Sequence, residues 1–201
     1  MTLPAKIGLG CVGVVGISGV GYLGSNLIKN EPRETFKSKY SVAIKGFLDN
    51  STTLNKKLEA LEKSSTDPKH PELIAAKNHK KGSKNKEAEE SLKRGCKDIH
   101  NKPVDNGFLE DFKNYCSFNN EDKIETGKSL VASNSDLGNK WSSFNQKTVK
   151  DLHEEFKDIN KPANGSADEA WKGSMLSKCK KLAAEIFKGE ISNFKEFCIK
   201  S

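Results

Sequence analysis

Arginine is almost missing from this sequence, although basic residues are abundant. Only Arg33 and Arg94 are arginine among the 34 basic residues, and the formal net charge is +7. The guanidinium group is preferred for bidentate recognition of phosphates and bases, whereas a lysine ammonium acts as a solvated point charge. The basic charge by itself therefore does not indicate a specific nucleic-acid partner.

Core-forming residues and catalytic motifs are also scarce. Hydrophobic residues make up 34% of the 201 positions and the mean hydropathy is −0.68, so a large enclosed active-site pocket is not expected. No serine or cysteine lies in a nucleophile motif such as G-x-S-x-G. The isolated histidines His70, His79 and His153 fit surface positions better than roles as bases. We therefore predict no catalytic residue, no cofactor and no metal site, and hence no enzyme.

One long uncharged segment lies near the N-terminus. Between Lys6 and Lys29, the 22 residues from Ile7 to Ile28 carry no charge, and seven of them are glycine. As a helix this segment would be about 33 Å long at roughly 1.5 Å per residue, close to a hydrocarbon core of about 30 Å. Membrane helices tolerate glycine and use small residues for close packing. The sequence thus predicts that residues 1–30 are a membrane anchor with a single transmembrane helix.

Two other interpretations of this segment stay open. A cleaved signal peptide fits the positive start and the apolar run, but Gly19-Val20-Gly21 is the nearest substitute for a small-residue cleavage site. Gly19, Gly21 and Gly24 also match G-x-G-x-x-G, and this stretch looks like the NAD-binding fingerprint of extended short-chain dehydrogenases. That fingerprint needs a second parallel strand, whereas residues 31–45 are polar and helical in pattern.

Apolar residues after Asn30 recur every three or four positions, which indicates helices. They do so in two early stretches and in one long later stripe: Phe36, Tyr40, Ile44, Phe47 and Leu48; Leu54, Leu58 and Leu61; and Trp141, Phe144, Val149, Leu152, Phe156 and Ile159. Ser166 and Glu169 form a capping-box pattern that opens a further helix. No stretch resembles a strand pair. The predicted fold class is all-α, with small helical bundles in two units, residues 31–120 and 121–201.

The stretch Lys77–Lys102 is the most basic part of the body. It contains nine basic and four acidic residues, a local excess of five, and no aromatic residue. A single-strand nucleic-acid binder is expected to offer aromatic stacking surfaces, which this stretch lacks. A solvated linker and helix face is the better interpretation, and binding of nucleic acid or acidic lipid is the alternative.

A pattern around the four cysteines of the body occurs twice. Leu92-x3-Cys96 is followed by Tyr115-Cys116, and Met175-x3-Cys179 is followed by Phe197-Cys198. A glycine turn lies halfway in each copy, at Asn106-Gly107 and at Lys188-Gly189. Antiparallel arms of nearly equal length would bring each pair to the Cα separation of about 5–6 Å that a disulfide requires. We predict the disulfides Cys96–Cys116 and Cys179–Cys198, each closing a loop that stabilises the fold by roughly 3 kcal/mol.

Two alternatives for these cysteines remain. The four thiols can instead be reduced and buried as small hydrophobic groups. A zinc site at Cys96, His100 and Cys116 is the other possibility, but no histidine lies near Cys179 or Cys198, so a metal role would not have been duplicated.

Several features together resemble a known group of proteins. The opening Met1-Thr2-Leu3-Pro4-Ala5-Lys6 with its glycine-rich run, the Trp141-x2-Phe144 element and the two aromatic-cysteine endings are similar to the expanded paralogous uncharacterised proteins of haemotropic mycoplasmas. The resemblance covers most of the chain through loose motifs, and Tyr115 and Phe197 replace a frequent tryptophan. It implies a membrane or surface protein without established enzymatic activity, suspected of surface exposure, host interaction or antigenic variation. It assigns no functional residue.

The two indicators of membrane orientation disagree. Lys29, Arg33, Lys37 and Lys39 follow the apolar segment, whereas only Lys6 and the terminal amine precede it, which favours a cytoplasmic body. Disulfides favour the outside, because a reducing cytosol keeps thiols free. We expect a single-pass protein of the cell membrane with an extracellular body that contacts a host protein or cell surface. The rivals are an intracellular tethered protein that binds through Lys77–Lys102 and an NAD-binding protein.

Overall fold

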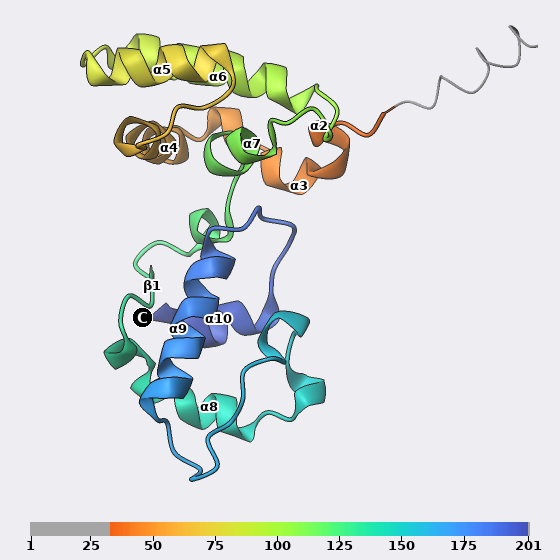
Figure 1. Cartoon of the computed structure of the whole chain (residues 1–201), viewed down its shortest axis with the longest axis vertical. Helices are drawn as coiled ribbons and strands as arrows, with labels where there is room; N and C mark the ends of the chain where they lie inside the picture. The colour runs from red at the N-terminus through yellow and green to blue at the C-terminus, as the bar shows by residue number, and fades with distance from the viewer. Residues whose placement is uncertain (1–32, 201) are drawn as a thin grey trace, which may run out of the picture. The chain divides into compact units, whose positions relative to one another are not determined.

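The computed structural model describes residues 33–200, and these residues are mostly helical. The α-helices are α2 (Phe36–Lys39), α3 (Ser41–Ile44), α4 (Ser51–Lys63), α5 (Pro71–Lys81), α6 (Asn85–His100), α7 (Leu109–Tyr115), α8 (Trp141–Gln146), α9 (Glu169–Ala183) and α10 (Ser192–Cys198) (Figure 1). Short 3-10 helices lie between them: η1 (Phe47–Asp49), η2 (Asn120–Lys123), η3 (Asn134–Lys140), η4 (Val149–Asp151) and η5 (Glu154–Phe156). The helical character of the body is confirmed. The predicted anchor Ile7–Ile28 and the glycines of the NAD-binding interpretation lie outside the described residues.

One short strand pair differs from the prediction that the body contains no strands. β1 (Ser129–Leu130) and β2 (Ile199–Lys200) pair antiparallel, with Leu130 opposite Ile199. The amide of Val131 extends the pairing by donating to the carbonyl of Cys198 at 2.9 Å. The backbone that leaves α10 is buried and needs partners, which β1 supplies. A pair of two residues is too short to produce an alternating sequence pattern.

The long apolar stripe from Trp141 to Ile159 does not form one helix. α8 ends at Gln146, and only single 3-10 turns follow before residue 159. Thr148 and Asp151 cause part of the break, because the Asp151 carboxylate accepts the amide of Thr148 at 2.9 Å and its hydroxyl at 2.8 Å. Such side-chain bonds offer the backbone an alternative to a continuous helix. Val149, a member of the predicted stripe, is 63% exposed, whereas Phe144 and Phe156 are buried.

The start of α9 also differs from the predicted capping box at Ser166 and Glu169. Asp168 is the N-cap, and its carboxylate accepts the amide of Trp171 at 2.7 Å. Aspartate is a good N-cap because it satisfies a free amide and its charge interacts favourably with the positive helix end. Glu169 is instead the first residue of the helix and pairs with Lys172.

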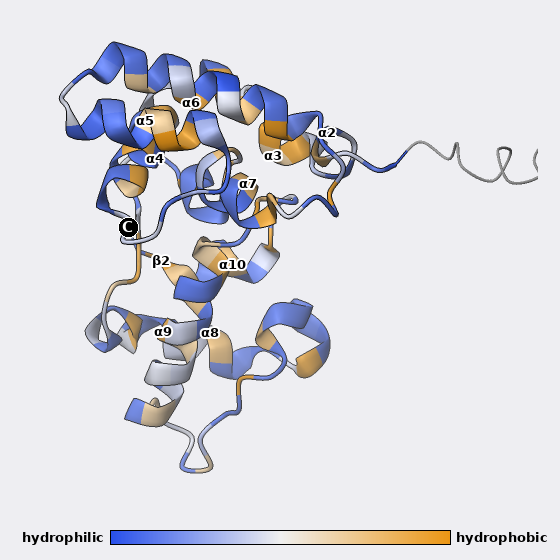
Figure 2. Ribbon diagram, turned by 45° about the horizontal axis from the view of Figure 1, so that its top comes forward, coloured by the Kyte–Doolittle hydropathy of each residue, from blue (hydrophilic) through white to orange (hydrophobic). Residues whose placement is uncertain are grey.

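Two groups of buried side chains form the hydrophobic core. The first comes from residues 36–118 together with Ile186, and the second from residues 131–199. Figure 2 shows short hydrophobic stretches separated by hydrophilic ones along the helices. Both groups belong to one compact unit of residues 34–201. The division into separate units 31–120 and 121–201 stays a prediction.

The close packing of α5 on α6 depends on Gly95. A Cβ at this position would lie 3.1 Å from Glu72 Cβ, 3.1 Å from Leu73 Cδ2 and 3.3 Å from His70 Nδ1. These distances are shorter than ordinary van der Waals contact, so the glycine lets the two helices approach. Figure 1 shows α5 and α6 running alongside one another.

The segment between the two core groups is tied to the end of α9 by hydrogen bonds. The side-chain amide of Asn119 donates to the carbonyl of Ala184 at 2.8 Å, and that of Asn120 donates to the carbonyl of Leu182 at 2.6 Å. The amide of Phe187 donates to the carbonyl of Phe118 at 2.9 Å. Carbonyls at a helix C-terminus lack partners within the helix, and the two asparagines supply them. These bonds fix the position of the loop that follows α9.

Candidate functional site

The four cysteines of the body form the two predicted disulfides. Cys96 and Cys116 are bonded with a Cα separation of 4.9 Å, and Cys179 and Cys198 with a separation of 5.2 Å. All four side chains are completely buried. One bridge lies in each core group. The interpretation as reduced thiols and the interpretation as thiolate zinc ligands are both incompatible with these bonded sulfurs.

Each bridge closes a hairpin whose turn contains a glycine in the left-handed region. Gly107 between α6 and α7 has φ +85°, and Gly189 between α9 and α10 has φ +127°. An L-residue with a side chain adopts such angles at a cost, so glycine suits both turns. The predicted arrangement of two arms about a central glycine is therefore confirmed.

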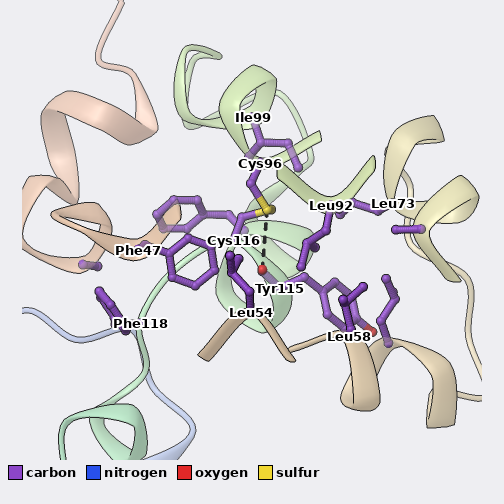
Figure 3. Close-up of a cluster of buried hydrophobic side chains, with 14 of the residues drawn as sticks. Phe47, Leu54, Leu58, Leu73, Leu92, Cys96, Ile99, Tyr115, Cys116 and Phe118 are labelled. Carbon is purple, nitrogen blue, oxygen red and sulfur yellow. Dashed lines mark hydrogen bonds between the residues drawn. A yellow bond between two sulfur atoms is a disulfide. The ribbon is translucent and has the colours of Figure 1, made fainter. Parts of the chain in front are cut away.

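The Cys96–Cys116 bridge lies in the middle of its core group. Figure 3 shows it surrounded by Leu54, Leu92, Ile99 and other apolar side chains. The dashed line joins Cys96 Sγ to the carbonyl oxygen of Tyr115, which are 3.5 Å apart. A bonded sulfur carries no proton, so this approach is a packing contact and not a hydrogen bond. The bridge therefore takes part in the apolar packing of this core group as well as linking two helices.

His100 is next to this bridge, and one of its ring nitrogens contacts the backbone of the hairpin. Its Nε2 lies 2.7 Å from the carbonyl oxygen of Cys116, and the side chain is buried. Burial lowers the pKa of His100, and the bond to the Cys116 carbonyl opposes this shift in part. A neutral imidazole with its proton on Nε2 satisfies the carbonyl. His100 thus serves the packing of the disulfide hairpin.

His70 is buried, contrary to the prediction of a surface position. Its Nδ1 accepts the amide of Glu72 at the start of α5, and its Nε2 lies 2.7 Å from Asp98 of α6. The backbone amide of His70 donates to the buried carboxylate of Asp111 at 2.8 Å. The hydrogen bond from His70 lowers the pKa of Asp98. The two ring nitrogens connect α5 with α6, and the backbone amide adds the link to α7; no nucleophile takes part.

The other two predicted surface histidines are each partly buried. His153 caps η5, with its Nδ1 accepting the amide of Glu155 at 3.3 Å, and its own amide donates to the buried Asn193. His79 lies near the C-terminus of α5. Neither is part of a cluster with other catalytic side chains. Within residues 33–200, no group of three or more histidine, cysteine, aspartate or glutamate residues is placed to hold a metal ion.

Four of the nine basic residues of the Lys77–Lys102 stretch pair with carboxylates of the protein itself. Lys77 is buried, and its ammonium lies 2.7 Å from Asp67 and 3.1 Å from the carbonyl of Thr66. Three further basic residues of the stretch pair with carboxylates: Lys93 with Glu89, Arg94 with Glu72, and Lys102 with Asp98. The stretch is helix α6 and the end of α5, and its remaining lysines project from that surface. This arrangement agrees with the helix-face interpretation.

A cleft of about 410 Å³ lies beside the loop that follows α9. Its apolar wall comes from residues that follow η2, from the loop itself, from α10 and from β2: Ile124, Phe187, Ile191, Phe194 and Ile199. Gly189, the turn of the second disulfide hairpin, also lines it. The wall formed by the loop after α9 and by α10 is thus held at two points. One is the hydrogen bond from Phe187 to Phe118, and the other is the Cys179–Cys198 bridge.

The charges of the cleft are not balanced. Four lysines and three glutamates line it, and all three glutamates already have partners. Glu125 lies 2.8 Å from Lys128, Glu190 lies 2.9 Å from Lys195, and Glu196 lies 3.3 Å from Lys147. The other two lining lysines, Lys123 and Lys140, form no ion pair within 4.0 Å among residues 33–200. Two lysines of the cleft therefore lack a carboxylate partner among residues 33–200.

Sequence reasoning did not find this cleft. Its residues are spread from Asn120 to Ile199 and come together through long-range links, among them the bonds that tie Asn119 and Asn120 to the end of α9. One signal was present, because Phe187 lies in a loop and belongs to no helical stripe. An apolar residue outside a stripe either packs against another part of the chain or lines a site.

Within the part of the chain that the structure describes, no helix is both long and apolar enough to cross a membrane. Comparison with known proteins gives no match: no family model, no curated protein and no solved structure is significantly similar to this chain. Its function therefore has to be argued from its own residues.

Proposed function

We propose that this chain is a membrane-anchored, surface-displayed protein whose body works by interaction and not by catalysis. The observation that carries the proposal is the presence of one buried disulfide in each core group. Disulfides persist in oxidising compartments and are rare in a reducing cytosol. A lysine-rich body with narrow apolar stripes also gains most from covalent links, which is typical of extracellular proteins with little core.

The sequence supports the anchoring part of this proposal. Ile7–Ile28 has the length and lack of charge of a membrane span. The resemblance to the paralogous surface proteins of haemotropic mycoplasmas favours the same placement, with a host protein or cell surface as partner. The lysines that follow the segment favour the opposite side, but the disulfides outweigh them, because bonded cysteines in the cytosol would be reduced.

The non-catalytic part rests on how the polar side chains are used. The two most buried histidines, His70 and His100, bond to Asp98 and to the Cys116 carbonyl, and each joins one helix to another. Catalytic groups instead converge on a cleft with perturbed pKa values and free positions for a substrate. The cleft at Phe187 is lined by lysines, glutamates and apolar residues, which suits binding.

The oxidation state in cells tests the proposal directly. Intact cells are first treated with a permeant maleimide that blocks free thiols, and the protein is then denatured, reduced and labelled with a polyethylene glycol maleimide. We expect four labelled cysteines, with Cys11 blocked in the first step. A Cys11→Ser variant is the control, because it must give the same four labels. Absence of labelling after reduction would show free thiols and refute an extracellular body.

The side of the membrane and the anchor need separate measurements. Protease added to intact cells is expected to digest residues 33–201, whereas a cytoplasmic marker protein stays intact. Carbonate washing is expected to leave the protein in the membrane fraction. Its release by carbonate would refute the anchor. Protection from protease, together with free thiols, would instead support the intracellular rival that binds through Lys77–Lys102.

A further inference from the structure

Part of the apolar wall of the cleft stays exposed in the folded protein. Phe187 and Ile191 are only partly buried, although they lie in a loop held at both ends. The volume of about 410 Å³ lies within the range of roughly 300–1,000 Å³ typical of small-molecule sites. The wall therefore offers apolar contact area to a molecule of modest size.

Lys123 and Lys140 indicate the sign of that molecule. Because the three glutamates of the cleft are paired, a cation would meet no free carboxylate there. An anion would meet the ammonium groups of Lys123 and Lys140, which have no carboxylate partner among the described residues. Within residues 33–200, Lys140 donates to the carbonyl of Ile199 alone, at 2.6 Å, and an ammonium has three protons to donate.

Lys123 is held in place by aromatic rings and not by an acid. Its Nζ lies 3.2 Å from the centroid of the Phe118 ring and 5.5 Å from that of Phe187. Burial lowers the pKa of Lys123, while the charge of Asp122 opposes the shift. Asp122 is itself bound to Lys57. An ammonium that is already oriented on a ring surface loses less freedom when it pairs with an incoming anion.

A carboxylate fits these groups better than a phosphate does. Phosphate sites usually rely on arginine forks, and no arginine lines this cleft. Two separate ammonium groups beside an apolar wall instead match one negative charge joined to an apolar body.

We propose that the cleft binds a small organic carboxylate with an apolar body, whose charge pairs with Lys123 and Lys140 and whose body packs on Phe187 and Ile191. The proposal goes beyond surface display and does not depend on it, because binding is measured on purified protein. Failure of the binding experiment would leave the thiol-labelling result unaffected, and free thiols in cells would leave the binding result unaffected.

The test uses the full chain in lipid nanodiscs and 4-(4-fluorophenyl)butanoate as a soluble probe, followed by fluorine NMR. The neutral amide of the same acid is the matched ligand, and empty nanodiscs correct for binding to lipid. We expect the carboxylate to bind and the amide to bind at least about fivefold more weakly, since one modest ion pair accounts for that ratio. Equal binding of acid and amide, or no binding of the acid at millimolar concentration, would overturn the proposal.

Three variants locate the site. Lys123→Met and Lys140→Met keep most of the side-chain volume and remove the charge. Each is therefore expected to weaken binding of the acid about fivefold without changing binding of the amide. Lys150→Met removes an exposed lysine that lies outside the cleft and is the control. Equal weakening by all three would show a general charge effect and contradict the assignment. Far-ultraviolet circular dichroism checks that each variant folds.

Two further probes distinguish the source of such a carboxylate. Hexanoate represents a free acyl chain, and N-acetyl-phenylalanine represents the C-terminus of a peptide. Competition by hexanoate alone would identify an acyl ligand, and competition by N-acetyl-phenylalanine alone would identify a peptide end. Failure of both to compete with the probe would contradict the ligand class.

Discussion

The ammonium of Lys57 lies 2.9 Å from the carboxylate of Asp122, and the two side chains are only 6% and 2% exposed. Lys57 also donates to the side-chain oxygen of Asn119, whose amide in turn donates to the Ala184 carbonyl at the end of α9. Asp122 accepts the backbone amide of Asn119 at 2.9 Å. The pair therefore supports the segment that joins the two core groups and carries one side of the cleft.

Removing one partner of this pair is expected to destabilise the protein strongly. Lys57→Met leaves the buried charge of Asp122 without a partner, which costs about 3–5 kcal/mol of unfolding free energy. Asp122→Asn keeps an oxygen that can accept the Asn119 amide but leaves Lys57 unpaired, and a similar loss is expected. Urea unfolding followed by circular dichroism measures both.

Two comparisons make this prediction specific. The double variant Lys57→Met/Asp122→Asn should lose less than the sum of the single changes, because neither charge is then left alone. Lys63→Met breaks an exposed contact of 4.0 Å with Glu59 and should change stability by no more than about 0.5 kcal/mol. If the loss of stability in the double variant equals the sum of the two single losses, the pair is not coupled.

The two disulfides should each contribute measurably to stability. The bridges join residues 20 and 19 positions apart. Loops of this size correspond to about 3 kcal/mol from restriction of the unfolded chain. Cys96→Ser/Cys116→Ser and Cys179→Ser/Cys198→Ser should therefore each lower the unfolding free energy by about that amount. Serine should cause at least as large a loss as alanine would at the same positions. The sites are completely buried, and burying a hydroxyl group there is unfavourable. Unchanged urea midpoints would contradict a stabilising role.

Two helical glycines should respond to alanine in opposite directions. At Gly95, the new Cβ would press on Glu72 and Leu73 of α5, and overpacking typically costs about 1–3 kcal/mol. Gly173 in α9 has no atom within 4 Å of such a Cβ, so Gly173→Ala should gain up to about 1 kcal/mol from helix propensity. Thermal unfolding of the two variants checks this. A gain at both positions would show that α5 and α6 are not closely packed.

The parts of the fold that could be predicted are those coded locally. Leu54, Leu58 and Leu61 lie on one face of α4 and are buried as their spacing indicates. The disulfide pairing could also be predicted, because a glycine halfway between two cysteines allows arms of equal length. Both inferences need only the spacing of residues within one or two helices.

The parts that could not be predicted depend on partners far along the chain. Asn119 and Asn120 have no local pattern, and their carbonyl partners lie more than 60 residues later. His70 is the N-cap of α5 and lies outside the apolar stripes, yet Asp98 and Asp111 make its burial favourable. The cleft depends on the same long-range bonds. The spacing of hydrophobic residues along the sequence cannot reveal a site whose walls are brought together by hydrogen bonds between distant polar side chains.

His100 should make the stability of the fold depend on pH below neutrality. Burial lowers its pKa in the folded state below the ordinary value of 6.5, to which it returns on unfolding. Between these two values the unfolded chain binds more protons, so the unfolding free energy must fall as the pH drops through this window. Well above pH 6.5 the imidazole is neutral in both states and contributes no slope.

Glutamine at position 100 separates this effect from the titration of other groups. His100→Gln can keep a donor for the Cys116 carbonyl but cannot take up a proton, so it lacks the share of the slope that belongs to the imidazole. The wild-type protein should therefore lose more stability than the variant between pH 7 and pH 5, while the difference between them stays constant from pH 7 to pH 8. Urea unfolding at one-unit intervals gives both slopes. If two proteins take up different numbers of protons on unfolding, the difference between their unfolding free energies must change with pH. Parallel curves over the whole range would therefore show that the buried imidazole does not couple folding to protonation.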